Sequence, residues 1–382
     1  MRNSTLIFVR RGKISRWKSN VYATIVALAS ASTLSGTMFA EAAADISADR
    51  TDTKVGVPTN TRKTEPTYNV TAGIDGDVFP VFANFASLQQ PFEREWGVVA
   101  VTIRNTSEAT VRNRIAVRVE GWSDQEIQMV EIGPGQVHTF KFAPTFLPRL
   151  YRNHEITAAT AVVEISDGAG RNAYDTTVPV RLRSADDMYW GDKFKYAPFI
   201  ASWVTPHELQ VENILARAKN YVPGRRLPGY EAWKTSEQQE KSTYTQAKAI
   251  YQALQRQGLS YVKSSLTFGE NVAVSQRVRK PSESIINSSA NCIDGAVVFA
   301  SLFENLAMDP IVVLVPGHAY VGVRVAKGSA RYLFIDAALT GRMSFEGAVE
   351  SAESGLTKFG PSQITRIPID QSRDMGIYPM PY

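Results

Sequence analysis

Three residues of types that perform covalent chemistry follow one another in the second half of the sequence: Cys292, His318 and Asp336. Cys292 is the only cysteine among the 382 residues. A thiolate attacks carbonyl carbons, an imidazole moves the proton that this attack displaces, and a carboxylate orients the imidazole. The order thiol, imidazole, carboxylate therefore predicts a site for cysteine-dependent acyl transfer.

The residues around the cysteine predict a helix that begins at the thiol. An almost continuous apolar run, 293–306, follows Cys292, and Asn291 offers a capping side chain just before it. Backbone N–H groups at a helix N-terminus stabilise anions, so they favour a thiolate there and can hold an oxyanion. Asn291 is accordingly a candidate for oxyanion binding or support, and Asp294 is expected to support the helix end.

Two strands and a turn are expected to carry the other two residues. The β-rich runs 311–315 and 319–325 are separated by a Pro-Gly break, which fixes the direction of His318. A further run, 332–336, ends on Asp336. The alternative interpretation is structural: an inert buried thiol, a hydrogen-bonded strand histidine and a turn-forming aspartate. The order and the element types together favour the catalytic interpretation.

Three motifs carry a resemblance to a known family. The segments NCIDGAVVFASLFENLAMDP, PGHAYVGV and YLFID resemble the nucleophile helix, the histidine strand and the aspartate strand of the transglutaminase-like superfamily, which has a papain-like cysteine fold. The resemblance covers about residues 205–349. It implies that Cys292 is the nucleophile, His318 the general base and Asp336 the orienting acid. These enzymes often supply an oxyanion side chain from upstream, and Tyr261 is the candidate for it.

The resemblance and the residues imply no cofactor. The acyl-transfer reaction needs neither a metal nor an organic group, and no acidic loop signals the calcium dependence known in the superfamily. We therefore expect no metal ligands and no cofactor.

The positive charge of the chain is concentrated at its N-terminus. The net charge is +5, and residues 1–44 contain six basic residues and one glutamate, so the remainder has a formal charge of zero. The basic, apolar and small-residue order of this segment predicts a secretory signal peptide. We expect a secreted or periplasmic protein, the alternative being an uncleaved segment that anchors it to a membrane. A neutral mature chain gives little attraction for nucleic acid.

The rest of the chain divides by composition. Residues 45–67 are polar and predict a flexible linker. Alternating apolar residues between turn signals predict an antiparallel, immunoglobulin-like β-sandwich over 68–185. An aromatic-rich segment, 186–204, is expected to pack between domains, the alternative being a stacking face for a glycan or peptide. Residues 205–382 are expected to form the transglutaminase-like domain, so the predicted class is α+β.

Two helices are expected before the catalytic segment. Thr205 and Glu208 match a capping box and predict that the first begins immediately after Thr205. The second is predicted from Ser236 to Gln257. His138 and His154 stand alone in the β-rich region and are expected to be surface or hydrogen-bonded residues.

The leading functional prediction is an exported thiol enzyme that hydrolyses peptide or peptide-like amide bonds. An enzyme that passes the acyl group to an amine, and so cross-links proteins, is an alternative of the same chemistry. A non-catalytic binding or scaffold protein of the cell envelope is an alternative of another class. The expected partners are a protein or peptide substrate and cell-envelope proteins.

Overall fold

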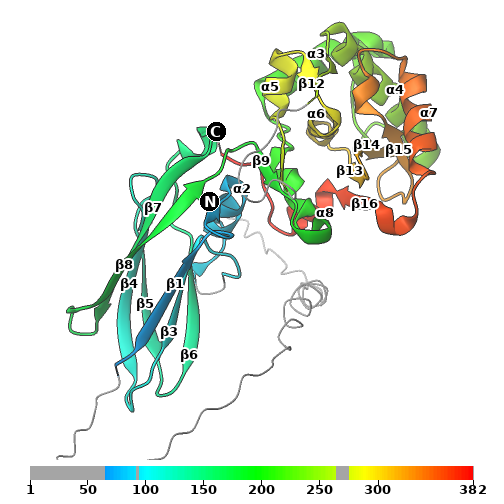
Figure 1. Ribbon diagram of the computed structural model, residues 1–382. Helices are drawn as coiled ribbons and strands as arrows, with labels where there is room; N and C mark the ends of the chain where they lie inside the picture. Colours follow the sequence, from blue (N-terminus) through cyan, green and yellow to red (C-terminus); the bar gives the residue numbers. More distant parts are fainter. Residues whose placement is uncertain (1–64, 92–93, 264–274, 382) are drawn as a thin grey trace, which may run out of the picture. The chain divides into compact units, whose positions relative to one another are not determined.

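The computed structural model describes residues 65–91, 94–263 and 275–381 (Figure 1). The predicted signal peptide, 1–44, and most of the predicted linker lie outside the described residues. The described part is mixed α and β and contains several antiparallel sheets, as the predicted α+β class requires. Within these ranges, no helix is both long enough and apolar enough to cross a membrane.

Residues 67–182 form two sheets. The first is antiparallel, with the strand order β1-β3-β6: β1 Thr67–Ala72, β3 Val99–Arg104 and β6 Val137–Phe142. The second has the order β2-β8-β7-β4-β5 and is parallel only between β2 and β8. Its strands are β2 Asp77–Val78, β8 Asn172–Leu182, β7 Thr157–Asp167, β4 Val111–Val119 and β5 Glu126–Ile132.

The alternation read from the sequence is confirmed in these strands. Val99, Val101 and Ile103 of β3 are fully buried, whereas the residues between them are partly exposed. Ile115 and Val117 of β4 lie in the same hydrophobic core. Because side chains of a strand alternate between its two faces, each of these strands has one face in the core.

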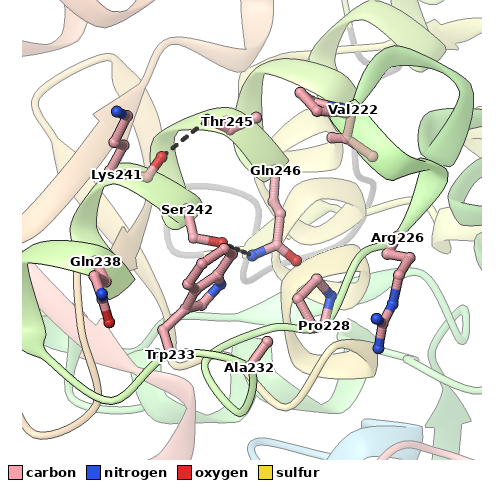
Figure 2. Close-up of a pocket in the computed structure, with 11 residues that line it drawn as sticks. Val222, Arg226, Pro228, Ala232, Trp233, Gln238, Lys241, Ser242, Thr245 and Gln246 are labelled. Atoms are coloured by element: carbon pink, nitrogen blue, oxygen red, sulfur yellow. Dashed lines mark hydrogen bonds between the residues drawn. The ribbon is translucent and has the colours of Figure 1, made fainter.

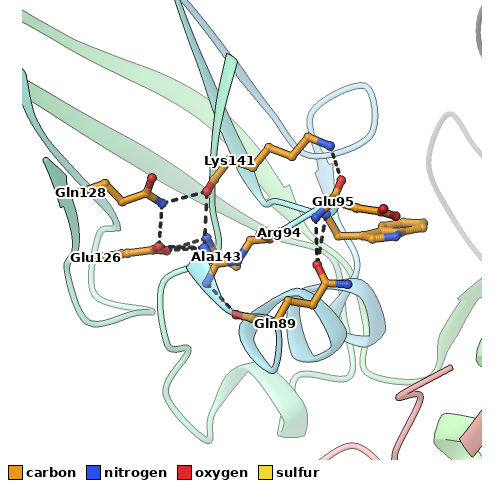
Figure 3. Close-up of polar contacts among 8 residues, drawn as sticks. Gln89, Arg94, Glu95, Glu126, Gln128, Lys141 and Ala143 are labelled. Atoms are coloured by element: carbon orange, nitrogen blue, oxygen red, sulfur yellow. Dashed lines mark hydrogen bonds and ion pairs between the residues drawn. The ribbon is translucent and has the colours of Figure 1, made fainter. Parts of the chain in front are cut away.

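A partly buried ion pair fixes the segment before β3 to strands β5 and β6 (Figure 3). Nη1 of Arg94 donates to both carboxylate oxygens of Glu126, at 2.7 and 2.9 Å. Glu126 also accepts the backbone N–H of Ala143 at 2.7 Å and the amide of Gln128 at 3.0 Å. The side chains of Arg94 and Glu126 are 4% and 14% exposed, so these hydrogen bonds offset the cost of burying both charges.

The aromatic-rich segment packs its rings against helix α2, Pro80–Ser87. The ring centroid of Phe82, in this helix, lies 5.3, 5.2 and 4.8 Å from the ring centroids of Trp96, Tyr196 and Phe199. Edge-on and offset contacts at these distances are favourable for aromatic pairs. These contacts support the packing interpretation of the segment, and the stacking alternative stays a prediction.

The remaining strands and helices carry the catalytic segment. A four-stranded antiparallel sheet has the order β15-β14-β13-β16: β15 Tyr332–Ile335, β14 His318–Arg324, β13 Pro310–Val315 and β16 Thr365–Pro368. Two strand pairs are separate from it: β9 Asp187–Tyr189 with β11 Ser275–Arg277, and β10 Ser260–Tyr261 with β12 Ser289–Ala290. The helices are α3 Leu209–Ala218, α4 Ser236–Arg256, α5 Pro281–Ile286, α6 Cys292–Asn305, α7 Phe345–Leu356 and α8 Ile369–Asp374.

Short 3-10 turns connect many of these elements. They are η2 Leu150–Arg152, η3 Asp192–Phe194, η4 Ala197–Trp203, η5 Lys219–Tyr221, η6 Pro223–Arg225, η8 Ala337–Leu339 and η9 Pro361–Gln363. Helix α6 packs against β13 and β14, and α7 packs against β15. The described residues all belong to one compact unit. The predicted domain boundaries inside that unit stay a prediction.

Of the two helices predicted before the catalytic segment, the first begins later than predicted and the second is confirmed. Helix α3 begins at Leu209, with Glu208 as an N-cap that makes no side-chain cap bond. The predicted capping box is absent because its two residues have other partners: the Thr205 N–H donates to Ser301 Oγ at 2.8 Å, and the Glu208 carboxylate accepts the N–H of Ser282 at 2.9 Å. The second predicted helix is confirmed as α4.

Candidate active site

The histidine and the aspartate of the site meet at one end of two neighbouring strands in the four-stranded sheet. His318 is the first residue of β14, and Asp336 follows the last residue of β15. The two strands are antiparallel, with Val321 opposite Ile335, so the start of one lies beside the end of the other. Nε2 of His318 lies 3.0 Å from Oδ1 of Asp336. Adjacent strands therefore hold the imidazole and the carboxylate at hydrogen-bond distance.

The thiol reaches the same histidine from helix α6. Cys292 is the first residue of this helix and is partly exposed, and its side chain lies near enough to His318 to influence the pKa of the imidazole. Since Nε2 of the ring faces Asp336, Nδ1 is the nitrogen left for the sulfur. The ring also packs edge-on against Tyr320, at a centroid distance of 4.7 Å. The structure thus brings the three predicted residues Cys292, His318 and Asp336 together.

The neighbours of the imidazole favour its charged form. Burial lowers the pKa of His318, but the hydrogen bonds with Asp336 and Cys292, together with their charges, outweigh burial and raise the pKa to about 9. An imidazolium beside a sulfur stabilises a thiolate. The charged form of the imidazole is therefore favoured next to the side chain that would act as the nucleophile.

Backbone and side-chain donors fix the carboxylate that faces the ring. Oδ1 of Asp336 also accepts the N–H of Ala338 at 3.2 Å, and Oδ2 accepts the hydroxyl of Ser351 at 3.1 Å. The N–H of Asp336 donates to the carbonyl of Ala348 at 3.0 Å. Only 6% of the residue is exposed. Ser351 lies on α7, and nothing in its local sequence signals that it contacts the aspartate.

A second network fixes the start of the cysteine helix. Oδ1 of Asn291 accepts the N–H of Asp294 at 2.8 Å, and Oδ2 of Asp294 accepts the N–H of Asn291 at 3.2 Å, which is a capping box. Arg279 donates its backbone N–H to Oδ1 of Asp294 at 2.8 Å, and its Nε lies 3.2 Å from Oδ2. Asp294 thus has the expected supporting position, and Arg279 is a contributor that the sequence did not indicate.

Hydrogen bonds and a nearby positive charge partly offset the cost of burying the Asp294 carboxyl in this network. Burial raises the pKa of Asp294, while the hydrogen bonds from Arg279 and Asn291 and the charge of Arg279 oppose that rise. The side chain is fully buried. The helix that carries the thiol therefore begins on a closed polar network rather than on a free end.

The two candidates for oxyanion binding differ in accessibility. Asn291 is 3% exposed, and its Nδ2 is closed off from solvent, without a hydrogen-bond acceptor in the described part of the chain. A substrate oxygen cannot reach this atom unless the side chain moves, so the visible role of Asn291 is support. Tyr261 is 49% exposed and pairs through β10 with Ala290, two residues before Cys292. Tyr261 is therefore the accessible candidate.

A group of possible metal ligands lies outside this site. His154, Asp186 and Glu283 bring one ligand atom each to within 4.8 Å of one another. Nη2 of Arg277 lies 3.0 Å from Oδ2 of Asp186, and the charge of Asp186 also acts on Lys280. Protein cations therefore already balance these carboxylates. The expectation that no metal or cofactor takes part stays a prediction.

No family model matches the chain, and no curated protein matches it significantly in sequence. The geometry of the site is therefore the basis for assigning a function.

Proposed function

We propose that the protein is an exported enzyme that hydrolyses peptide or peptide-like amide bonds through Cys292, His318 and Asp336. In this proposal residues 205–382 form a papain-like, transglutaminase-like domain and residues 68–185 an immunoglobulin-like sandwich. One observation carries the proposal: a single imidazole lies 3.0 Å from a buried carboxylate and is also close enough to the thiol for the two groups to interact. This is the connectivity that a thiol nucleophile requires.

The first half of the proposed reaction breaks the amide bond. The Cys292 thiolate attacks the carbonyl carbon, a C–S bond forms, and the carbonyl oxygen becomes an oxyanion. The N–H groups of the first helical turn are unpaired by the helix itself, and the capping box leaves those of Cys292 and Ile293 for this oxyanion. His318 then donates its proton to the leaving nitrogen, the C–N bond breaks, and a thioester remains.

The second half releases the acyl group. A water molecule gives a proton to the His318 ring as its oxygen attacks the thioester carbon. The C–S bond breaks, and the products are a carboxylic acid and the thiolate, which is again paired with the imidazolium. Throughout, Asp336 holds the ring in one orientation and balances its charge. An amine in place of water would give a new amide by the same steps.

The first test measures the reactivity of the thiol. The chain has one cysteine, so iodoacetamide labels a single position, and intact mass reports the rate. We expect rapid alkylation at neutral pH. In His318→Ala the rate should be at least about 10-fold lower, because the thiolate loses its counterion. His207→Ala is the matched control, since His207 is exposed and outside the site.

The second test identifies the acceptor. Incubation with a mixed peptide substrate, followed by mass spectrometry, distinguishes new chain ends from amide bonds formed with an added primary amine. Cleavage that Cys292→Ser abolishes supports the proposed hydrolase, and amine incorporation without cleavage identifies a cross-linking enzyme. A thiol that reacts no faster than in the denatured chain, with neither product, contradicts the enzyme and favours the envelope scaffold.

A further inference from the structure

A cavity of about 630 Å³ lies between the loop that follows α3 and the first half of α4 (Figure 2). Its lining residues fall within 222–233 and 238–246, and the triad residues are not among them. The volume is within the range of small-molecule sites in proteins. The cavity is therefore a separate feature of the fold.

The loop that forms one wall of the cavity is fixed to the helix that forms the other. The side-chain amide of Gln246 accepts the N–H of Gly229 at 2.9 Å and donates to the Gly229 carbonyl at 3.0 Å. It also donates to Oγ of Ser242 at 2.9 Å. Gly229 has a φ of +58°, and a Cβ there would collide with the carbonyl oxygen of Leu306. The cavity is thus preformed, which lowers the entropic cost of binding a ligand.

The walls suit a flat apolar group. Val222, Pro228 and Ala232 contribute aliphatic surface, and the indole of Trp233 lies in the middle of the lining residues (Figure 2). Trp233 is 39% exposed, which is unusual for a large ring that has apolar neighbours at hand. An aromatic ring seated on this indole would remove apolar surface of both rings from water.

Two cations border the cavity, and neither has a counterion among the residues that the structure describes. Arg226 and Lys241 lie on opposite sides of Trp233 (Figure 2), and none of the 11 lining residues is acidic. Neither charged group has an ion pair or hydrogen bond with another residue in the described ranges. Both side chains are exposed and long, so each can turn its charge toward an anion bound beside the indole.

We infer that this cavity binds a small organic carboxylate that carries an aromatic group. The ring stacks on Trp233, and the carboxylate lies between Arg226 and Lys241. The inference stands apart from the proposed hydrolase, because none of these residues belongs to that site.

The test uses two probes of the same size, one an anion and the other neutral. Phenylpropionate and phenylpropanol share the ring and the chain length, and neither contains an amide bond that the proposed enzyme could cleave. Each is titrated into the full chain by calorimetry and by ligand-observed NMR. We expect saturable binding of the acid, about 5-fold or more tighter than the alcohol, with a preference that falls as salt is added.

Four variants locate the binding site. Arg226→Gln and Lys241→Gln should each weaken the acid about 3-fold or more and leave the alcohol unchanged. Trp233→Ala should weaken both probes. Lys234→Gln is the matched control, since it removes an exposed neighbouring cation that does not line the cavity.

The outcomes that overturn the inference are specific. They are an acid that does not saturate, equal affinity for acid and alcohol, and acid binding that Trp233→Ala leaves unchanged. Cys292→Ala should bind phenylpropionate as the unmodified chain does, so a negative result here leaves the proposed hydrolase untouched. Because the four substituted side chains are exposed, an unchanged melting temperature shows that any loss of binding is local.

Discussion

A Cβ atom placed on Gly295 would lie 2.9 Å from the Cβ of Ala337. The first residue of the helix that contains Gly295 is Cys292, and Ala337 directly follows Asp336. The proposed nucleophile and the residue that orients its base are thus carried by elements with no space for a methyl group between them. The glycine fixes how closely the two elements approach.

Gly295→Ala should separate these elements. The alanine favours the helix by about 1 kcal/mol, but overpacking in a core costs about 1–3 kcal/mol, so the variant should be less stable. The distance between Cys292 and His318 should also grow, and alkylation should slow. Gly360→Ala is the control, because its new Cβ meets nothing closer than 3.8 Å. A variant that reacts and melts as the original does would show that the contact is unimportant.

Ser351→Ala should weaken the orientation of the base. The hydroxyl donates to Oδ2 of Asp336, and a hydrogen bond to a charged group contributes about 1.5–3 kcal/mol. We expect lower stability and slower alkylation of Cys292, with partial recovery in Ser351→Thr. Ser354→Ala, on the exposed face of the same helix, should change neither quantity. Equal effects of the two alanine variants would contradict the positioning role.

Two substitutions at Asn291 separate capping from oxyanion binding. Asn291→Ala removes the acceptor for the N–H of Asp294 and should cost about 1 kcal/mol of stability. Asn291→Ser keeps an acceptor at the helix start but has no amide, so stability and peptide cleavage should both be largely retained. A stable serine variant with a cleavage rate about 100-fold lower would identify the Asn291 amide as an oxyanion donor instead.

Tyr261→Phe tests the accessible oxyanion candidate. If the hydroxyl donates to the oxyanion, peptide cleavage should slow about 10-fold or more, with little change in KM. Alkylation by iodoacetamide forms no oxyanion, so its rate should be unchanged. Tyr244→Phe, another exposed tyrosine, is the control. Unchanged cleavage would leave the backbone N–H groups as the oxyanion donors.

The stability of the protein should fall as pH rises through the slightly alkaline range. Folding raises the pKa of His318 from an ordinary value of 6.5 to about 9. Its contribution is complete below pH 6.5 and is lost as the pH rises toward 9. Because the ring is partly exposed, solvent screening keeps the loss in free energy of unfolding below the ~3 kcal/mol that the full shift would give. Urea unfolding on both sides of this window measures the change. His318→Gln should flatten it, and an equal slope in both proteins would contradict the assignment.

The elements of the site were predictable because their signals are local. An apolar run after Cys292 and two β-rich runs around a Pro-Gly break are enough to place a helix and two strands in order. The alternation of Val99, Val101 and Ile103 likewise predicted a half-buried strand. Periodicity and turn residues report on neighbours in sequence, and these elements depend mainly on such neighbours.

The supporting contacts were not predictable for the opposite reason. Ser351 meets Asp336 across 15 positions, and Arg279 meets Asp294 across the same number. Thr205 and Glu208 do match the pattern of a capping box. The Thr205 backbone N–H, however, donates to Ser301, 96 positions away, and this bond contributes to the later start of the helix. Contacts between distant segments decide such cases, and a single sequence does not display them.

The carboxylate of Asp336 contacts the imidazole and Ser351, and it also caps the short turn that follows through its bond to Ala338. Replacing Asp336 would change the local backbone conformation as well as any reaction. An inactive variant at Asp336 would therefore say little about the mechanism. His318 lies at the beginning of a strand, so its substitution is a more selective way to abolish the proposed activity.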